Sequence, residues 1–270
     1  TGSSRTYVNQ IQFGMSPKPQ SITLEIGADQ NPDYSGNYYL PVYDYAYHAI
    51  SQQIYLKDEI GQGECLINSV SFKIGSGTAE TRQYEVYMKN TDQSTFSNAN
   101  YIAMSASDKV FDGNVEVGSA GTWCTIQFTT PFNYTGSNVV VCVYDKSGKR
   151  ANGYHSFYKY SATGRSLYSQ GSSAYNITSL TTGSTRTYVN QVQFEMEPKP
   201  TYTTITVEIG ADQNPDYSGN FYLPVYDFAK YALSQQIYTK NEIGQGECMI
   251  NSVSFKIGSG NQATRQYEVY

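Results

Sequence analysis

The chain has 270 residues, of which 15% are charged and 14% aromatic, and its formal net charge is −5. This balance of aromatic content and low net charge excludes an intrinsically disordered chain. The sequence shows no basic patch and no apolar run of about 20 residues, which argues against a nucleic-acid partner and against a helix that spans a bilayer.

Two stretches of the chain occur twice, which establishes an internal repeat. Residues 1–19 return at 182–200 with 15 of 19 positions identical, and residues 22–87 return at 205–270 with 54 of 66 identical. The offset is 181 residues in the first pair and 183 in the second. Identity this high indicates recent duplication of a unit of that length. The sequence therefore predicts a tandem array, which we expect to continue in both directions.

The repeat divides the chain into five predicted parts. Residues 1–15 are expected to be the last strand of a preceding repeat, and residues 16–20 a linker. Proline has no amide hydrogen for a sheet ladder, so the alternate prolines favour an extended spacer. Residues 21–197 are predicted to form one complete repeat, residues 198–202 a second linker, and residues 203–270 the first part of the next repeat. Because that last part lacks most of its strands, it is not expected to fold alone.

A polar motif near the start of the complete repeat carries a candidate metal site. Side-chain oxygens alternate on Asp29, Asn31 and Asp33, as at the start of a calcium loop, and calcium prefers oxygen ligands. Tyr34 stands where such a loop needs glycine, and no distal glutamate is identifiable. The alternative is a turn in which these side chains bond their own backbone. The second copy repeats the motif at Asp212, Asn214 and Asp216.

A tyrosine cluster follows, at Tyr34, Tyr38, Tyr39, Tyr43, Tyr45 and Tyr47. Exposed rings stack on sugar faces, so by analogy with other jelly rolls the first four of these tyrosines, together with Trp123, are a candidate glycan platform. A platform predicts a flat row of exposed rings. The alternative is packing inside strands and at junctions between repeats, with each tyrosine hydroxyl at the wet edge and Trp123 half-buried.

Hydrophobic periodicity predicts the fold class. Apolar and polar residues alternate in 69–74 and in 123–128, which indicates strands with one buried face. The continuous apolar run 139–143 predicts a central strand buried on both faces, and residues 55–61 predict a single helical turn stopped by glycine. With about ten short strands per repeat, separated by Gly-rich turns, the sequence predicts an all-β chain of tandem β-sandwich, jelly-roll-like domains.

The cysteines and histidines bear on chemistry. Each repeat has three cysteines, Cys65, Cys124 and Cys142, which leaves at least one unpaired within a repeat. Cys124 and Cys142 flank a turn, where they face each other across a hairpin as a disulfide or are buried as thiols; we favour the thiols. The second copy has tyrosine in place of His48, and no serine has an elbow motif that would support a Ser-His-Asp arrangement on His155. No enzymatic activity is expected.

Several strings of the repeat resemble a known group of proteins, namely those at residues 51–61, 108–111, 121–123, 128–132 and 189–194. They are similar to the repeat domains of large Bacteroidetes surface proteins, and the resemblance covers the whole repeat. It implies a jelly-roll fold related to cleaved-adhesin domains, export through the type IX secretion system, and a role in adhesion, gliding or surface filaments. It carries over no catalytic site.

These observations leave several functions open. The first hypothesis is a structural and adhesive repeat of a long secreted cell-surface protein that forms an extended fibre or stalk. The alternative is a carbohydrate-binding module repeated for avidity. A third is a filament in which identical chains pack side by side. The partners expected are therefore neighbouring repeats, identical chains and surface glycans; no cofactor is expected unless calcium binds at Asp29, Asn31 and Asp33.

Overall fold

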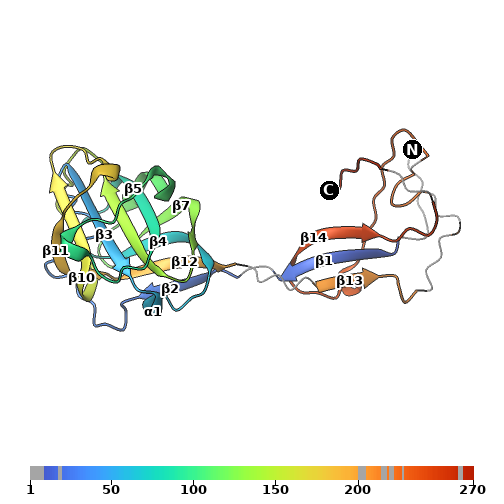
Figure 1. Cartoon of the computed structure of the whole chain (residues 1–270), viewed down its shortest axis with the longest axis horizontal. Helices are drawn as coiled ribbons and strands as arrows, with labels where there is room; N and C mark the ends of the chain where they lie inside the picture. The colour runs from blue at the N-terminus through green and yellow to red at the C-terminus, as the bar shows by residue number, and fades with distance from the viewer. Residues whose placement is uncertain are drawn as a thin grey trace. The chain divides into compact units, whose positions relative to one another are not determined.

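The computed structural model describes residues 9–17, 20–199, 205–213, 218, 222–226, 228–260 and 264–270. The chain divides into two compact units, drawn in Figure 1. One unit is residues 20–199, which we call the complete repeat; the other, which we call the second unit, combines residues 1–19 with residues 200–270. In the described part of the chain, no helix has the length and apolar character that a membrane span requires.

The complete repeat is built from two antiparallel sheets. The first has the order β2-β12-β4-β7, with β9 paired to β4: β2 (Ile22–Ile26), β12 (Val192–Pro198), β4 (Cys65–Ser76), β7 (Trp123–Tyr134) and β9 (Ser156–Phe157). The second has the order β11-β10-β3-β8-β5-β6: β11 (Ser184–Asn190), β10 (Lys159–Gly171), β3 (His48–Tyr55), β8 (Asn138–Asp145), β5 (Glu80–Thr91) and β6 (Lys109–Val117). Short helical turns complete the repeat: α1 (Lys57–Ile60), η1 (Ser97–Ala99), η2 (Ala106–Asp108) and η3 (Ile177–Ser179).

The strand order is that of a jelly roll. The chain passes from one sheet to the other between β2, β3, β4 and β5, and again between β6, β7 and β8. Without β9, β10 and β11, each sheet holds four strands, in the orders β2-β12-β4-β7 and β3-β8-β5-β6. Two Greek keys wound into two facing sheets give this arrangement. The all-β, jelly-roll-like sandwich expected from the sequence is confirmed, and β10 and β11 extend one sheet beyond it.

Two apolar clusters hold the sheets. The larger lies between them and includes Phe72 and Phe194 from one sheet and Val141 from the other. The smaller lies on the outer face of the six-stranded sheet, where Val140 packs with Tyr101 from the connection between β5 and β6. Neighbouring residues of β8 thus enter different clusters, because successive side chains of a strand point to opposite faces. The central strand expected at residues 139–143 is confirmed, between β3 and β5.

The helical turn predicted at residues 55–61 is also confirmed, as α1. Leu56 precedes it, and the side chain of Glu59 accepts a hydrogen bond from the Leu56 amide at 2.8 Å. Gly61 ends it with a φ of 60°, in the left-handed region. A side chain at that position would be strained, which explains why both copies have glycine there, Gly61 in the first and Gly244 in the second.

Of the two alternatives for Cys124 and Cys142, the favoured one, buried thiols, is confirmed, and the pairing across a hairpin is wrong. Cys124 lies on β7 and Cys142 on β8, and these strands belong to different sheets. Cys124 enters the cluster between the sheets, whereas Cys142 enters the outer one. All three cysteines of the repeat are buried free thiols. Burial raises the pKa of Cys65 to about 11 and the pKa of Cys124 and Cys142 to about 12, so these thiols are protonated and unreactive.

Both ends of the complete repeat lie at one pole, which we call the linker pole. Ile22 at the start of β2 pairs with Met196 near the end of β12. The amide of Lys199 then donates to the carbonyl of Glu64, just before β4. The chain therefore enters and leaves the repeat at adjacent points of one sheet.

The connections at the other pole, the loop pole, are those at residues 27–47, 77–79, 118–122 and 146–155. They are tied to one another and to the strand ends. The amide of Ala151 donates to the carbonyl of Asp44 at 2.8 Å. The amide of Ile74, near the end of β4, donates to the carbonyl of Thr122 at 2.9 Å.

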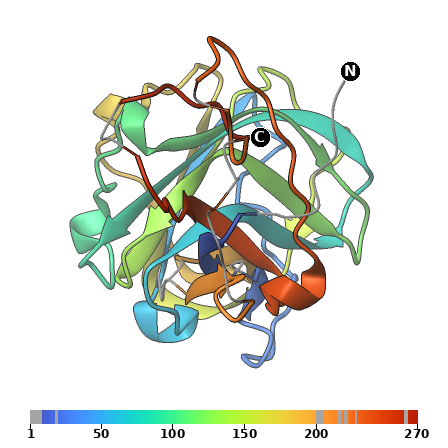
Figure 2. The same cartoon turned by 90° about the vertical axis from the view of Figure 1, so that its right-hand side faces the viewer.

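The second unit contains one three-stranded sheet. Its order is β13-β1-β14, with β1 (Ile11–Pro17), β13 (Ile205–Ile209) and β14 (Cys248–Phe255). The helical turn α2 (Lys240–Ile243) corresponds to α1, and both turns are visible in Figure 2, α1 in light blue and α2 in orange-red. Strands β1 and β12 run into the stretches predicted as linkers, ending at Pro17 and Pro198. A proline at the last position of a strand costs the ladder only one terminal hydrogen bond, so the strand tolerates it.

Candidate functional site

The connection 27–47 carries most of the predicted site residues, and a buried asparagine shapes it. The side-chain amide of Asn37 donates to the carbonyls of Leu40 at 3.2 Å and Phe157 at 2.9 Å, and its oxygen accepts from the Leu40 amide. Asn37 is fully buried, so its polar atoms need these partners. The connection is therefore held against β9 at Asn37, just before Tyr38 and Tyr39.

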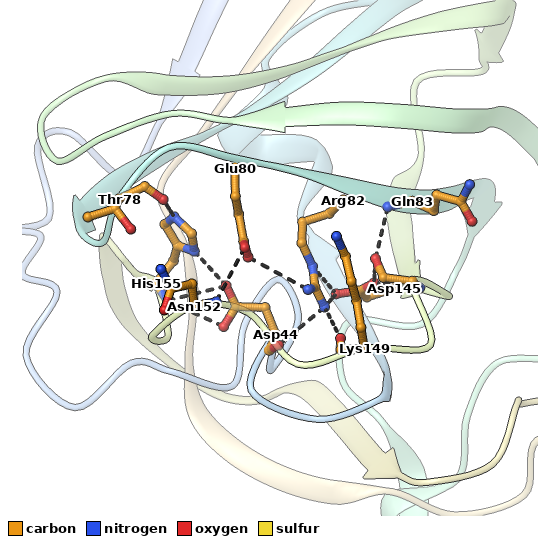
Figure 3. A network of polar contacts seen from close by, with 10 residues as sticks. Asp44, Thr78, Glu80, Arg82, Gln83, Asp145, Lys149, Asn152 and His155 are labelled. Carbon is orange, nitrogen blue, oxygen red and sulfur yellow. Dashed lines mark hydrogen bonds and ion pairs between the residues drawn. The ribbon is translucent and has the colours of Figure 1, made fainter.

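A histidine and an aspartate fix the far end of the same connection (Figure 3). His155 Nδ1 lies 2.5 Å from Asp44 Oδ2, and His155 Nε2 lies 2.8 Å from the carbonyl oxygen of Thr78. A carbonyl only accepts, so Nε2 carries a proton and donates it. Burial alone would lower the pKa of His155, but the hydrogen bond and charge of Asp44 outweigh it and raise that pKa. Neither ring nitrogen is free to take a proton from a serine.

The raised pKa of His155 predicts a pH dependence of stability. A histidine with a higher pKa in the folded state contributes stability that is complete below its unfolded pKa of about 6.5 and is lost as pH rises through the folded value. We expect the complete repeat to lose stability as pH rises above about 6.5, and His155→Gln to abolish this loss. Urea unfolding followed by Trp123, the single tryptophan, measures it. Equal slopes with pH in the two proteins would contradict the assignment.

An arginine pair adjoins the histidine pair. Arg82 Nη2 lies 2.7 Å from Asp145 Oδ2, and both side chains are buried. The same nitrogen donates to the carbonyls of Asp44 at 3.2 Å and Lys149 at 3.0 Å. Strand β5 is thereby tied to two loop-pole connections at once. We call Asp44, Arg82, Asp145 and His155 the buried charge network.

One group in this region has the composition of a metal site. Ligand atoms of Asp44, Glu80 and His155 all lie within 4.8 Å of one another. However, both nitrogens of His155 already have partners. Glu80 also lies 3.6 Å from Arg82, and the second copy has Ala263 at its position. The group is better explained as part of the buried charge network than as a metal site.

Next to this network, on both sides of Asp44 in the sequence, tyrosine rings form a connected surface. Tyr39 stacks on Tyr43 with ring centroids 5.3 Å apart and an angle of 25°, and Tyr168 of β10 lies 4.6 Å from Tyr39. Tyr43 continues the row to Tyr45 at 6.5 Å. Since Tyr168 is distant in sequence, the row joins the connection 27–47 to the extended edge of the six-stranded sheet.

The row continues onto the connection between β8 and β9. Tyr154 lies 5.7 Å from Tyr45 and 4.6 Å from Tyr38, both in edge-to-face geometry. Tyr45 is 40% exposed and Tyr154 46% exposed, whereas the other rings are half-buried. We call these rings the tyrosine face: Tyr38, Tyr39, Tyr43, Tyr45, Tyr154 and Tyr168.

Arginines lie at both ends of the tyrosine face. The guanidinium carbon of Arg186, on β11, lies 3.9 Å from the centre of the Tyr39 ring and 4.5 Å from that of Tyr168. At the other end, the guanidinium carbon of Arg150 lies 5.4 Å from the rings of Tyr45 and of Tyr47. A shallow groove of about 400 Å³ is lined by Gly36, Tyr39 and residues 185–188. The face thus combines aromatic surface with cationic hydrogen-bond donors.

The two remaining rings of the predicted platform lie in a separate cluster. Tyr34 contacts Tyr158 with ring centroids 5.2 Å apart. Lys73 Nζ lies 5.1 Å from the centre of the Tyr158 ring and 5.7 Å from that of Trp123. Trp123 is half-buried and has Lys73 over its ring. The structure therefore brings three of the five predicted residues together, Tyr38, Tyr39 and Tyr43, and places Tyr34 and Trp123 elsewhere.

The predicted calcium residues form a turn at the start of the same connection. Asp33 Oδ1 accepts from the Ser35 amide and from Lys159 Nζ, both at 2.8 Å. The bond from Lys159 lowers the pKa of Asp33. Asn31 has a φ of 49°, and Asp29 is exposed. This is the geometry of the alternative, an Asx turn, and calcium binding stays a prediction. In the second copy, Asn214 and Asp216 lie outside the described residues.

Comparison with known proteins adds little. No protein-family model and no curated protein matches the chain. Three solved chains match. One holds the cysteine protease and lectin-like domains of Cwp84, a surface layer associated protein of Clostridium difficile, with a TM-score of 0.35 and 14% identity over 57% of this chain and 32% of that one. Another is clostridial Cwp84 after propeptide cleavage, with a TM-score of 0.37 and 12% identity over 66% and 40%. The chain spans less than half the length of either of these chains.

Proposed function

We propose that the complete repeat is an adhesive module of a secreted, cell-surface tandem-repeat protein and that its tyrosine face binds glycans. The observation that carries this is the position of the face. Its rings lie on the connections 27–47 and 146–155 and on β10, and none belongs to the strand ends that carry the linkers. Neighbouring repeats attach at the linker pole, so every copy can present its face to a ligand.

The chemistry of the face suits a sugar. Aromatic rings pack on the C–H faces of a pyranose, and the tyrosine hydroxyls and arginine guanidinium groups supply hydrogen bonds to its hydroxyls. The rings meet mostly edge to face, so the surface is corrugated rather than the flat row expected of a platform. The second copy has Phe221 at the position of Tyr38 and Phe228 at that of Tyr45. Both changes remove a hydroxyl but keep the aromatic ring, and the ring is the part that stacks on a sugar.

The same geometry weakens the alternative of a pure stalk. Because Ile22 and Met196 are direct neighbours, the ends of a folded repeat are separated by about one strand spacing, roughly 5 Å. Folded repeats therefore add little length between linkers. An array of such units serves better to multiply a contact, since linked copies raise avidity through effective concentration. Export by the type IX pathway and a place on a bacterial surface belong to this proposal.

A glycan array followed by calorimetry on the whole chain tests the proposal. We expect Tyr39→Ala and Tyr154→Ala each to weaken binding about fivefold to tenfold, because a lost aromatic stacking partner costs about 1–1.5 kcal/mol. Tyr34→Ala, at an exposed ring outside the tyrosine face, serves as the matched control and should bind like the unmodified chain. Trp123 fluorescence verifies that each variant is folded. Failure to bind any glycan, or equal binding by all variants, would reject the proposal.

A further inference from the structure

The sheet of the second unit contains a strand from a different repeat. Strand β1 is the sequence copy of β12, whereas β13 and β14 are copies of β2 and β4. The complete repeat, residues 20–199, lies between β1 and β13 along the chain. The terminal strand of one copy thus pairs with strands of another copy that lies later in the chain.

The accepted strand takes the register of the native one. In the second unit, Phe13 pairs with Val207 of β13 and Val253 of β14. The corresponding pairs in the complete repeat join Phe194 to Leu24 and Val70. All five pairs with β13 and all seven with β14 correspond in this way. Even the bulge recurs, after Gly14 in β1 and after Glu195 in β12.

The side-chain contacts at the start of the strand also recur. The Asn9 amide donates to Gln236 Oε1 at 2.9 Å, its side-chain amide donates to the Leu223 carbonyl at 3.2 Å, and Tyr238 Oη donates to the Asn9 carbonyl at 3.3 Å. In the complete repeat, the equivalent bonds of Asn190 measure 2.7, 3.2 and 3.2 Å, with Gln53, Leu40 and Tyr55. Three polar contacts of the strand therefore recur, whereas the bond that Asn190 Oδ1 accepts from Gln53 Nε2 does not, since Asn9 Oδ1 is buried without a partner.

The main apolar contacts of the strand recur as well. Ile11, Phe13 and Met15 are buried in the cluster of the second unit. The ring of Phe13 meets that of Tyr238 at 5.7 Å and 87°, and Phe194 meets Tyr55 at 5.6 Å and 89°. Everything that distinguishes the strand thus lies within residues 9–17, and a copy needs only its β2-like and β4-like strands with their adjoining segments to receive it.

We propose that the terminal strand is exchangeable between copies of this chain. Residues 9–17 of one chain complete the sheet of residues 205–255 in a second chain, and the equivalent residues 190–198 do the same in an array. The partner is a second copy, and strand exchange links chains laterally without any ligand at the tyrosine face. Backbone pairing on both sides supplies affinity, and the pockets for Ile11, Phe13 and Met15 supply specificity.

Two complementary variants of the whole chain test this. The donor-blocked chain carries Phe13→Lys and Met15→Lys; the acceptor-blocked chain carries Ile209→Lys and Val253→Lys. Each should be monomeric alone, since a buried lysine weakens the pairing by about a hundredfold or more. When the two variants are mixed, the intact strand β1 of the acceptor-blocked chain can pair with the intact strands β13 and β14 of the donor-blocked chain. We expect a one-to-one heterodimer in sedimentation or light scattering, dispersed by excess of a peptide of residues 1–19.

Controls separate exchange from misfolding. Gln12→Lys places the same charge on the exposed side of β1, and adding it to the acceptor-blocked chain should leave the heterodimer intact. All substitutions lie outside the complete repeat, so its unfolding, reported by Trp123, should stay unchanged. Monomers in the mixture, or a heterodimer that the peptide does not disperse, would overturn the proposal.

Discussion

Replacing Arg82 by alanine is expected to lower the free energy of unfolding of the complete repeat by about 3–5 kcal/mol, because it leaves the buried charge of Asp145 without its partner. The guanidinium also donates to the carbonyls of Asp44 and Lys149, so its loss removes one hydrogen bond from each of these acceptors. Urea unfolding followed by the fluorescence of Trp123 measures the effect on this unit alone, since the chain has no other tryptophan.

A double variant separates charge from packing. Arg82→Met with Asp145→Leu removes both charges and fills similar volume, and such replacements of buried ion pairs are often neutral or stabilising. We expect the double variant to be more stable than Arg82→Ala. The Lys149 carbonyl loses the bond from Arg82 in it, and the Asp44 carbonyl keeps only the bond from the Ala151 amide, so full recovery is not expected. A loss below about 1 kcal/mol for Arg82→Ala would show that water replaces the guanidinium and that the network does not hold the loop pole.

The sequence predicted the parts of the fold that depend on local pattern. Alternation at residues 123–128 identified which side of β7 is buried, and the unbroken apolar run at 139–143 identified β8 as central. Alternation does not say which sheet a strand joins. The turn after Tyr134 looks like a hairpin in sequence, but the chain crosses there to the other sheet, which rules out the alternative that Cys124 and Cys142 face each other across a hairpin.

The candidate site was predictable only in part for a similar reason. Tyr38, Tyr39 and Tyr43 are close in sequence and lie together in the fold, so the sequence alone predicted their clustering. Tyr154 and Tyr168 join them from segments more than a hundred residues away, and no periodicity relates those segments to the connection 27–47. Of the partners that fix the connection, His155 lies 111 residues and Arg82 38 residues beyond Asp44. Only the tertiary fold brings these residues together.

Under tension applied at its ends, the complete repeat is expected to open at low force. Ile22 and Met196 are direct neighbours on antiparallel strands, so pulling at Gln20 and Lys199 loads the hydrogen bonds between β2 and β12 one after another. Bonds broken in sequence resist far less than bonds sheared together. If the array is adhesive as proposed, it would lengthen under load, because each opened repeat releases its residues while the tyrosine faces of other repeats stay attached.

Single-molecule pulling on the whole chain measures this. Opening of residues 20–199 should add roughly 600 Å, at about 3.3–3.6 Å per extended residue. A disulfide between Thr23→Cys and Glu195→Cys, which replace paired residues of β2 and β12, would carry the force past the repeat. With that bond closed, the long step should vanish, and reduction should restore it. If the repeat instead opened only at forces as high as those of a shear-loaded β-sandwich pulled in the same experiment, adjacency of its ends would not govern its response, and the array would act as a stiff tether rather than an extensible one.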